Sequence, residues 1–128
     1  QGDFRAAWGG IASLQLALSA TWTGASTRGF GLSDVARWLC EGPAQLGGLG
    51  HRKGKIAPGY DADLVVWRPE ESQFVRGSTL EHRHPLTPYE GMHLQGVIER
   101  TFVRGVEVCS RGALLDARAG QLVMRESP

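Results

Sequence analysis

Two histidines separated by a single residue are the clearest chemical motif in this sequence. His82 and His84 lie in the stretch LEHRHPLTPYEG, residues 80–91. A His-x-His pair can place two imidazole nitrogens on one metal ion, which would make this stretch part of a metal site. The other imidazoles, His51 and His93, lack ligand spacing to the pair, and no Cys, Asp or Glu group converges with it in the sequence. We therefore interpret the pair as structural or as part of an interface, and a metal site is the alternative.

Three aspartates are the candidates for acid–base chemistry. Asp63 follows an expected turn and precedes an apolar run, a position where a carboxylate commonly accepts hydrogen bonds from nearby backbone N–H groups. We predict a structural role for it. Asp3 lies close to a pair of glycines, and Asp61 lies just before Asp63. Asp3 and Asp61 stay possible acids at this point.

The elements that position these residues change type near residues 50–54. Residues 10–48 have helical periodicity, with one apolar stripe formed by Ile11, Leu14, Leu18, Trp22 and Ala25. Ser33 followed by Asp34 predicts the N-cap and first turn of a second helix. Gly42-Pro43 predicts the end of that helix, and Pro43 suits the first turn of a short third one. We expect Trp22, Trp38 and Trp67 to pack in the core or between layers.

The second half has the pattern of antiparallel strands. A β-favouring run covers 64–67, and 97–103 alternates, which would put Val97, Glu99, Thr101 and Val103 on one face. The RGVE stretch predicts a tight turn into a strand with Val106 and Val108, and 122–124 is expected to be a last short strand. The helical half supplies no sheet of its own, so we expect its helices to form the outer layer of a structure whose inner layer is missing.

Composition limits the classes of partner. The chain has 128 residues, 41% hydrophobic and 21% charged, and a formal net charge of +1. These values fit a folded domain and favour neither a nucleic-acid nor a membrane partner. Its two cysteines, far apart in sequence, are expected to be free thiols in a reducing compartment, with a disulfide as the alternative. No signal-peptide pattern and no C-terminal peroxisomal signal are seen, so we expect an intracellular protein whose compartment is unknown.

The stretch GKIAPGYDADLVVW, residues 54–67, resembles the metal-dependent amidohydrolase superfamily. In that superfamily a Gly-x-Ile, a Pro-Gly turn and an Ala-Asp-Leu-Val strand mark the return of the chain to a β-sandwich after a (β/α)8 barrel. The matching residues here are Gly54, Ile56, Pro58, Gly59, Ala62, Asp63, Leu64 and Val65. GPAQLGGL is similar to the helix that precedes this return, with Gly42 at a position where the superfamily has Asn.

Within the superfamily the chain is most similar to the allantoinase group of cyclic amidohydrolases. Two segments carry this resemblance, GDFRAAWGGIASLQ at 2–15 and LEHRHPLTPYEGMHLQGVIERTFVRG at 80–105. Dihydropyrimidinases and dihydroorotases share the Pro-(Tyr/Phe)-x-Gly part of the second segment and remain the alternative. The resemblance extends over nearly the whole chain, from Gly2 to about Leu122.

This resemblance implies an α/β fold, with the last loop and helices of the barrel in 1–50 and the C-terminal part of a composite β-sandwich in 51–128. It implies hydrolysis of a small cyclic ureide, allantoin to allantoate in purine catabolism, by an oligomeric enzyme, a homotetramer being expected. Two divalent metal ions, with zinc expected, would be held by ligands that precede the segment similar to 2–15. The resemblance therefore implies neither catalytic residues nor metal ligands in this chain. The chain would then be a C-terminal fragment that is inactive in isolation; a non-catalytic truncated isoform or assembly module is the other alternative.

Trp8, Gly9 and Gly10 are the candidate substrate-binding residues. In the resembled group, the loop after the last barrel strand touches the substrate ring, partly through backbone groups. Two glycines allow the backbone to approach a ligand closely. The alternative is that they only form the turn into the helix that begins near Ile11.

Overall fold

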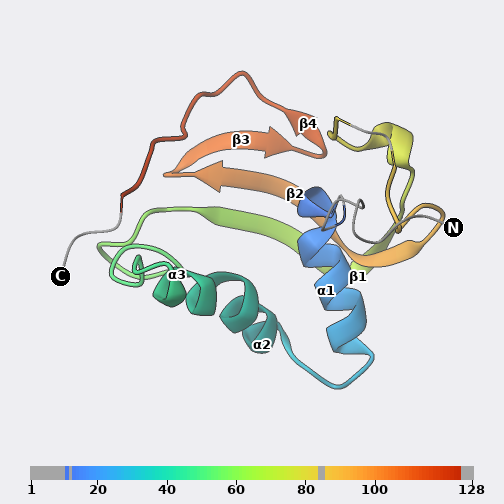
Figure 1. The fold of residues 1–128 in the computed structure, drawn as a ribbon, viewed down its shortest axis with the longest axis horizontal. Coiled ribbons are helices and arrows are strands. Elements are labelled where there is room, and N and C mark those ends of the chain that lie inside the picture. Colours follow the sequence, from blue (N-terminus) through green and yellow to red (C-terminus); the bar gives the residue numbers. More distant parts are fainter. Residues whose placement is uncertain (1–10, 12, 84–85, 125–128) are drawn as a thin grey trace, which may run out of the picture.

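In the computed structural model, helices come first and an antiparallel sheet follows, as the sequence predicts (Figure 1). The structure describes residues 11, 13–83 and 86–124. The helical elements are η1 (Leu14–Leu16), α1 (Ala17–Ser26), α2 (Leu32–Ala36), η2 (Arg37–Glu41), α3 (Gly42–Leu46) and η3 (Gly77–Thr79). The strands are β1 (Leu64–Phe74), β2 (His93–Val103), β3 (Val106–Ser110) and β4 (Ala113–Leu114).

The sheet has the order β1-β2-β3-β4, and each neighbouring pair is antiparallel. Arg104 and Gly105 join β2 to β3 with φ angles of 50° and 80°, the conformation of a two-residue turn that follows the twist of the strands. The predicted RGVE turn is therefore confirmed. The predicted strand at 122–124 is wrong, because these residues have no strand pairing, and β4 forms earlier in the chain instead.

A β-bulge in β2 interrupts the alternation that the sequence predicts. Trp67 pairs with Ile98 and Val66 pairs with Arg100, so Glu99 is the extra residue. As a result the consecutive residues Val97, Ile98 and Glu99 all line one depression. The prediction of two clean faces is wrong at this point, because a bulge changes which side of the strand the following residues occupy.

Helix α1 packs on β1 and β2 through polar and aromatic contacts. The Ser19 hydroxyl donates to the backbone oxygen of Gly96 at 2.6 Å and accepts from the Gln73 amide at 2.9 Å. The Trp22 indole N–H donates to the Pro69 oxygen at 2.8 Å, and its ring meets Trp67 edge to face at 5.8 Å. For α1, the inner layer that we expected to be missing is thus the sheet of the same chain.

The apolar stripe predicted for this helix is only partly right. Ala25 is buried, but Ile11 is 60% exposed and Leu14 is 94% exposed. Leu16, which the stripe omits, is 2% exposed and forms the core with Val75 and Leu94. The reason is that Leu14–Leu16 is a 3-10 turn. A 3-10 turn has fewer residues per turn than an α-helix, so it directs a different residue toward the sheet.

The second and third predicted helices form one continuous helical run. The first helix of the run is capped by Gly31 and not by Ser33, because the Asp34 carboxylate accepts from the Gly31 N–H at 3.0 Å. Gly42-Pro43 does not end it. A wide turn lets the Gly42 N–H reach the Arg37 oxygen five residues back, so the helix continues past a proline that has no N–H to donate.

Figure 1 shows β3 and β4 at the edge of the sheet that is far from α2 and α3. The helical run and the residue before its cap keep apolar side chains on the surface: Leu32 (48% exposed) and Leu46 (90%) lie in the run, and Phe30 (44%) precedes it. Trp38 contacts Phe30 edge to face at 5.0 Å yet stays 39% exposed, so the packing expected for this tryptophan is incomplete. None of the described helices is both long and apolar enough to cross a membrane.

Candidate functional site

The residues predicted to bind substrate, Trp8, Gly9 and Gly10, lie outside the described residues, as do Asp3 and His84. The prediction for the glycine pair therefore stays a prediction. The described chain resumes at Ile11 and at Ser13, so the structure defines the segment that follows the pair and the contacts that hold it.

His82 has a backbone partner in the structure. Its Nε2 lies 2.8 Å from the Gly77 oxygen. Its Nδ1 is buried and has no hydrogen-bond partner among the described residues. An imidazole that donates through Nε2 to a carbonyl braces the loop between the two residues. The interpretation of His82 as structural agrees with this contact.

The loop that carries His82 is closed at its base. The Val75 N–H donates to the Met92 oxygen at 2.9 Å, and the Gly91 N–H donates to the Val75 oxygen at 3.0 Å. The Glu90 carboxylate accepts from the Gly77 N–H. These bonds close the base of the loop that follows β1, and Leu80 and Tyr89 within it pack against the core.

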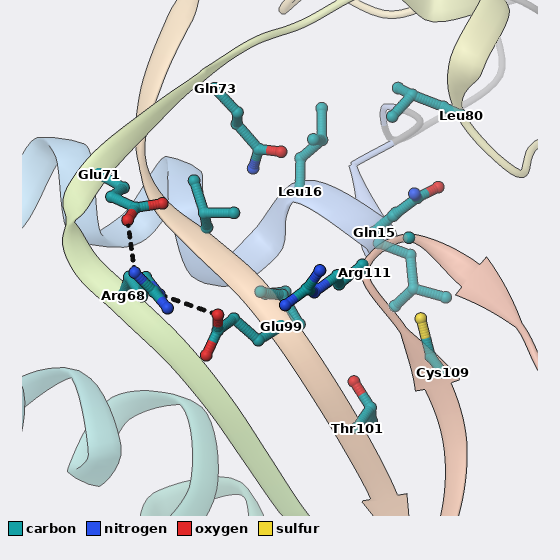
Figure 2. A pocket seen from close by; sticks show the side chains of 14 residues that line it. Gln15, Leu16, Arg68, Glu71, Gln73, Leu80, Glu99, Thr101, Cys109 and Arg111 are labelled. Atoms are coloured by element: carbon teal, nitrogen blue, oxygen red, sulfur yellow. Dashed lines mark hydrogen bonds and ion pairs between the residues drawn. The ribbon is translucent and has the colours of Figure 1, made fainter.

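A depression of about 640 Å³ lies between η1 and the sheet (Figure 2). Arg68 crosses one side of it and forms ion pairs with Glu71 at 2.9 Å and Glu99 at 2.8 Å. Cys109 and Arg111 line it from the β3 side. These groups include no acid–base pair beside a nucleophile, so the depression lacks the arrangement that covalent or general-base chemistry needs.

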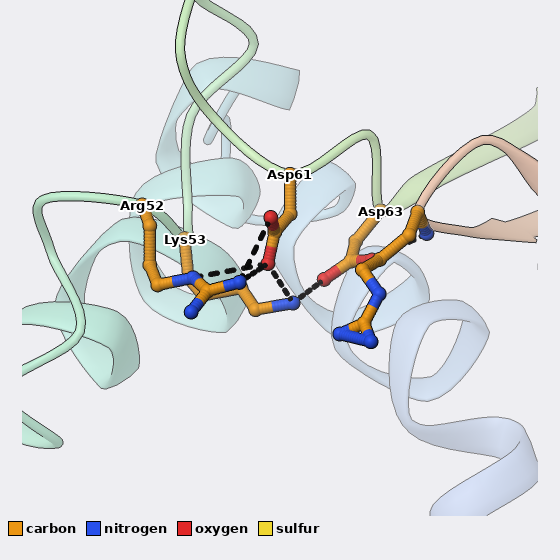
Figure 3. Close-up of polar contacts among 5 residues, drawn as sticks. Arg52, Lys53, Asp61 and Asp63 are labelled. Atoms are coloured by element: carbon orange, nitrogen blue, oxygen red, sulfur yellow. Dashed lines mark hydrogen bonds and ion pairs between the residues drawn. The ribbon is translucent and has the colours of Figure 1, made fainter. Parts of the chain in front are cut away.

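A second charged cluster joins the loop before β1 to the β2–β3 turn (Figure 3). The Lys53 ammonium lies between the carboxylates of Asp61, at 2.7 Å, and Asp63. Arg52 also pairs with Asp61 at 2.9 Å. Asp63 accepts from the Arg104 backbone N–H at 2.9 Å, so its carboxylate does bond backbone, although in a turn far along the chain and not in its neighbourhood.

The electrostatics of this cluster favour its charged forms. The hydrogen bond from Lys53 lowers the pKa of Asp61 against the opposing effect of burial. Burial raises the pKa of Asp63, but the hydrogen bonds from Lys53 and the Arg104 N–H outweigh it and leave this pKa lowered. Burial by itself would lower the pKa of Lys53. The hydrogen bonds to its two carboxylate partners outweigh burial, so the pKa of Lys53 is raised. We call this cluster of Arg52, Lys53, Asp61 and Asp63 the clasp. Both of its carboxyl groups favour the ionised form, so neither is suited to act as a general acid.

The described residues do not fit a metal ion. No three His, Cys, Asp or Glu side chains within 11, 13–83 and 86–124 come together as a ligand group. His93 instead contacts the ring of Phe74 edge to face at 5.0 Å. No catalytic step is assigned to a metal on these residues.

Sequence reasoning missed the polar side of α1. Ser19, Thr23 and Ser26 lie at spacings of four and three, which is one helical face. All three bond to the sheet: Ser19 to Gly96, Thr23 to the Gln95 N–H at 2.8 Å, and Ser26 to the Gln95 side chain at 2.9 Å. That spacing was the available signal, but a hydroxyl stripe on a helix is also compatible with solvent exposure.

The chain is similar to curated allantoinases over most of its length. It is 44% identical to the allantoinase of Streptomyces avermitilis over 124 residues, which are 97% of this chain and 27% of that protein. The allantoinase of Arabidopsis thaliana is 40% identical over 123 residues, 94% of this chain and 24% of that protein. The allantoinase of Saccharomyces cerevisiae is 41% identical over 105 residues, 82% of this chain and 22% of that protein. The chain thus spans about a quarter of the length of these relatives.

Solved structures agree with this kinship. The D-hydantoinase (dihydropyrimidinase) from Thermus sp. superposes with a TM-score of 0.81 at 27% identity, covering 91% of this chain and 26% of that one. The L-hydantoinase (dihydropyrimidinase) from Arthrobacter aurescens has a TM-score of 0.80 at 31% identity, covering 88% and 25%. The family model described as the amidohydrolase family matches residues 8–108. The chain belongs to the amidohydrolase family.

Proposed function

We propose that the complete protein containing this chain hydrolyses the ring amide of a cyclic ureide, with allantoin as substrate and allantoate as product. The observation that carries this proposal is the identity of 40–44% to curated allantoinases over more than nine-tenths of the chain. Solved hydantoinases, which have 27–31% identity, support the same broad chemistry of cyclic amides.

In this proposal the chain supplies the end of a larger enzyme. Residues 1–50 form the last loop and helices of a (β/α)8 barrel, and 51–128 form the C-terminal part of a β-sandwich. The apolar side chains left on the helical run support this assignment, because Leu46 at 90% exposure is better accounted for if further protein covers it. The complete enzyme is a homo-oligomer, and a homotetramer is the state to test.

The same proposal places catalysis outside the described part of this chain. Two divalent metal ions, with zinc as the first candidate, would supply a hydroxide and polarise the substrate carbonyl when bound, and their ligands would lie in the rest of the complete protein. Trp8, Gly9 and Gly10 contact the substrate ring, and the lack of side chains on the glycines lets backbone groups reach it.

The test is an assay of the complete purified protein on three substrates. We expect ring opening of allantoin, followed as allantoate formation, with a higher kcat/KM than for hydantoin or dihydrouracil. A higher kcat/KM for hydantoin or dihydrouracil would favour the second candidate, a dihydropyrimidinase-like enzyme, which the similarity to solved hydantoinases supports. A metal-loaded complete protein that opens none of these rings would favour a non-catalytic assembly module.

The substrate-loop assignment has its own test. Gly9→Val would fill the space that the backbone needs, and we expect KM to rise by about tenfold or more. Gly120→Val is the matched control, because a side chain at Gly120 meets open space. Equal KM values for the two variants would remove Gly9 from the substrate site.

A further inference from the structure

We draw no further inference here: the strongest candidate, the depression between η1 and the sheet, is lined by two arginines that are balanced by two glutamates, and nothing in the described part of the chain shows what covers it.

Discussion

Gly96 shows how a single residue fixes the packing of helix on sheet. It is buried in β2 with a φ of 94°, and a Cβ placed there would lie 2.7 Å from the Trp67 ring. Its backbone oxygen accepts from Ser19 on α1. Opposite it, β1 carries extra residues between Arg68 and Ser72. The absence of a side chain lets Trp67 and α1 approach β2 together.

Gly96→Ala is therefore expected to destabilise the fold strongly. The left-handed conformation costs about 1–2 kcal/mol for a residue with a Cβ, and the contact with an indole ring adds roughly 1–3 kcal/mol of overpacking. Gly29→Ala is the control, since Gly29 also has a positive φ of 80° but nothing within 4 Å. The measurement is urea unfolding of both variants. Equal losses would mean that Trp67 yields freely to the new methyl group.

The role of His82 differs between the sequence pattern and the structure. In the sequence its spacing to His84 suggests a metal ligand, but in the fold its Nε2 bonds to the Gly77 oxygen. The choice between the two depends on groups that lie elsewhere in space. A two-residue spacing alone carries no information about which carbonyls or carboxylates are near.

Among the elements, the loop before β1 is held by the clasp of Arg52, Lys53, Asp61 and Asp63. Gly54 in this loop has a φ of 89°, and a Cβ there would lie 2.8 Å from both the Ala44 Cβ and the Cys40 oxygen. The loop thus passes against the helical run on one side and is tied to the β2–β3 turn on the other. The GKIAPGYDAD motif encodes this connection between the helices and the sheet.

Asp63→Asn predicts a pH-dependent loss of stability. The folded pKa of Asp63 lies below its ordinary value of 3.8, so its stabilising effect is fully present above that value and is lost as the pH falls through the lower folded pKa. At pH 7 we expect a loss of about 1 kcal/mol, reduced by the partial exposure of the side chain. As the pH falls through this lowered pKa, the difference between variant and wild type should shrink, because the wild-type carboxyl becomes protonated.

The measurement is urea unfolding of variant and wild type at pH 7 and at a series of decreasing acidic pH values. The exposed Asp116, for which no ion pair is described, provides the control variant Asp116→Asn. A loss for Asp63→Asn that is as large at acidic pH as at pH 7 would show that the charge of Asp63 does not matter to the clasp.

On the scale of the whole molecule, the chain corresponds to about a quarter of its relatives. We expect the isolated 128-residue chain to release no allantoate with added zinc or manganese, because its described residues contain no ligand group for a metal. The assay uses the purified chain beside the complete protein as positive control. Allantoate release that co-purifies with the 128-residue chain through successive columns would contradict this.

The sequence by itself determined the family, the order of helices before strands and the RGVE turn. Each of these depends on short stretches whose residue types act locally: a Pro-Gly turn, an alternating strand, a pair of residues that tolerates positive φ. The amidohydrolase resemblance was visible in GKIAPGYDADLVVW for the same reason, since Gly54 and Gly59 adopt the positive φ that local turns require.

Only the tertiary structure decided how these pieces fit. The bulge at Glu99, the burial of Leu16 in place of Leu14, and the helical run that passes through Pro43 all contradict local rules. In each case a contact between residues far apart in sequence, or a hydrogen bond with unusual spacing, is worth more than the local preference it overrides. Ser19 is the clearest case: a hydroxyl on a helix has no assigned partner until β2 brings the Gly96 carbonyl to it.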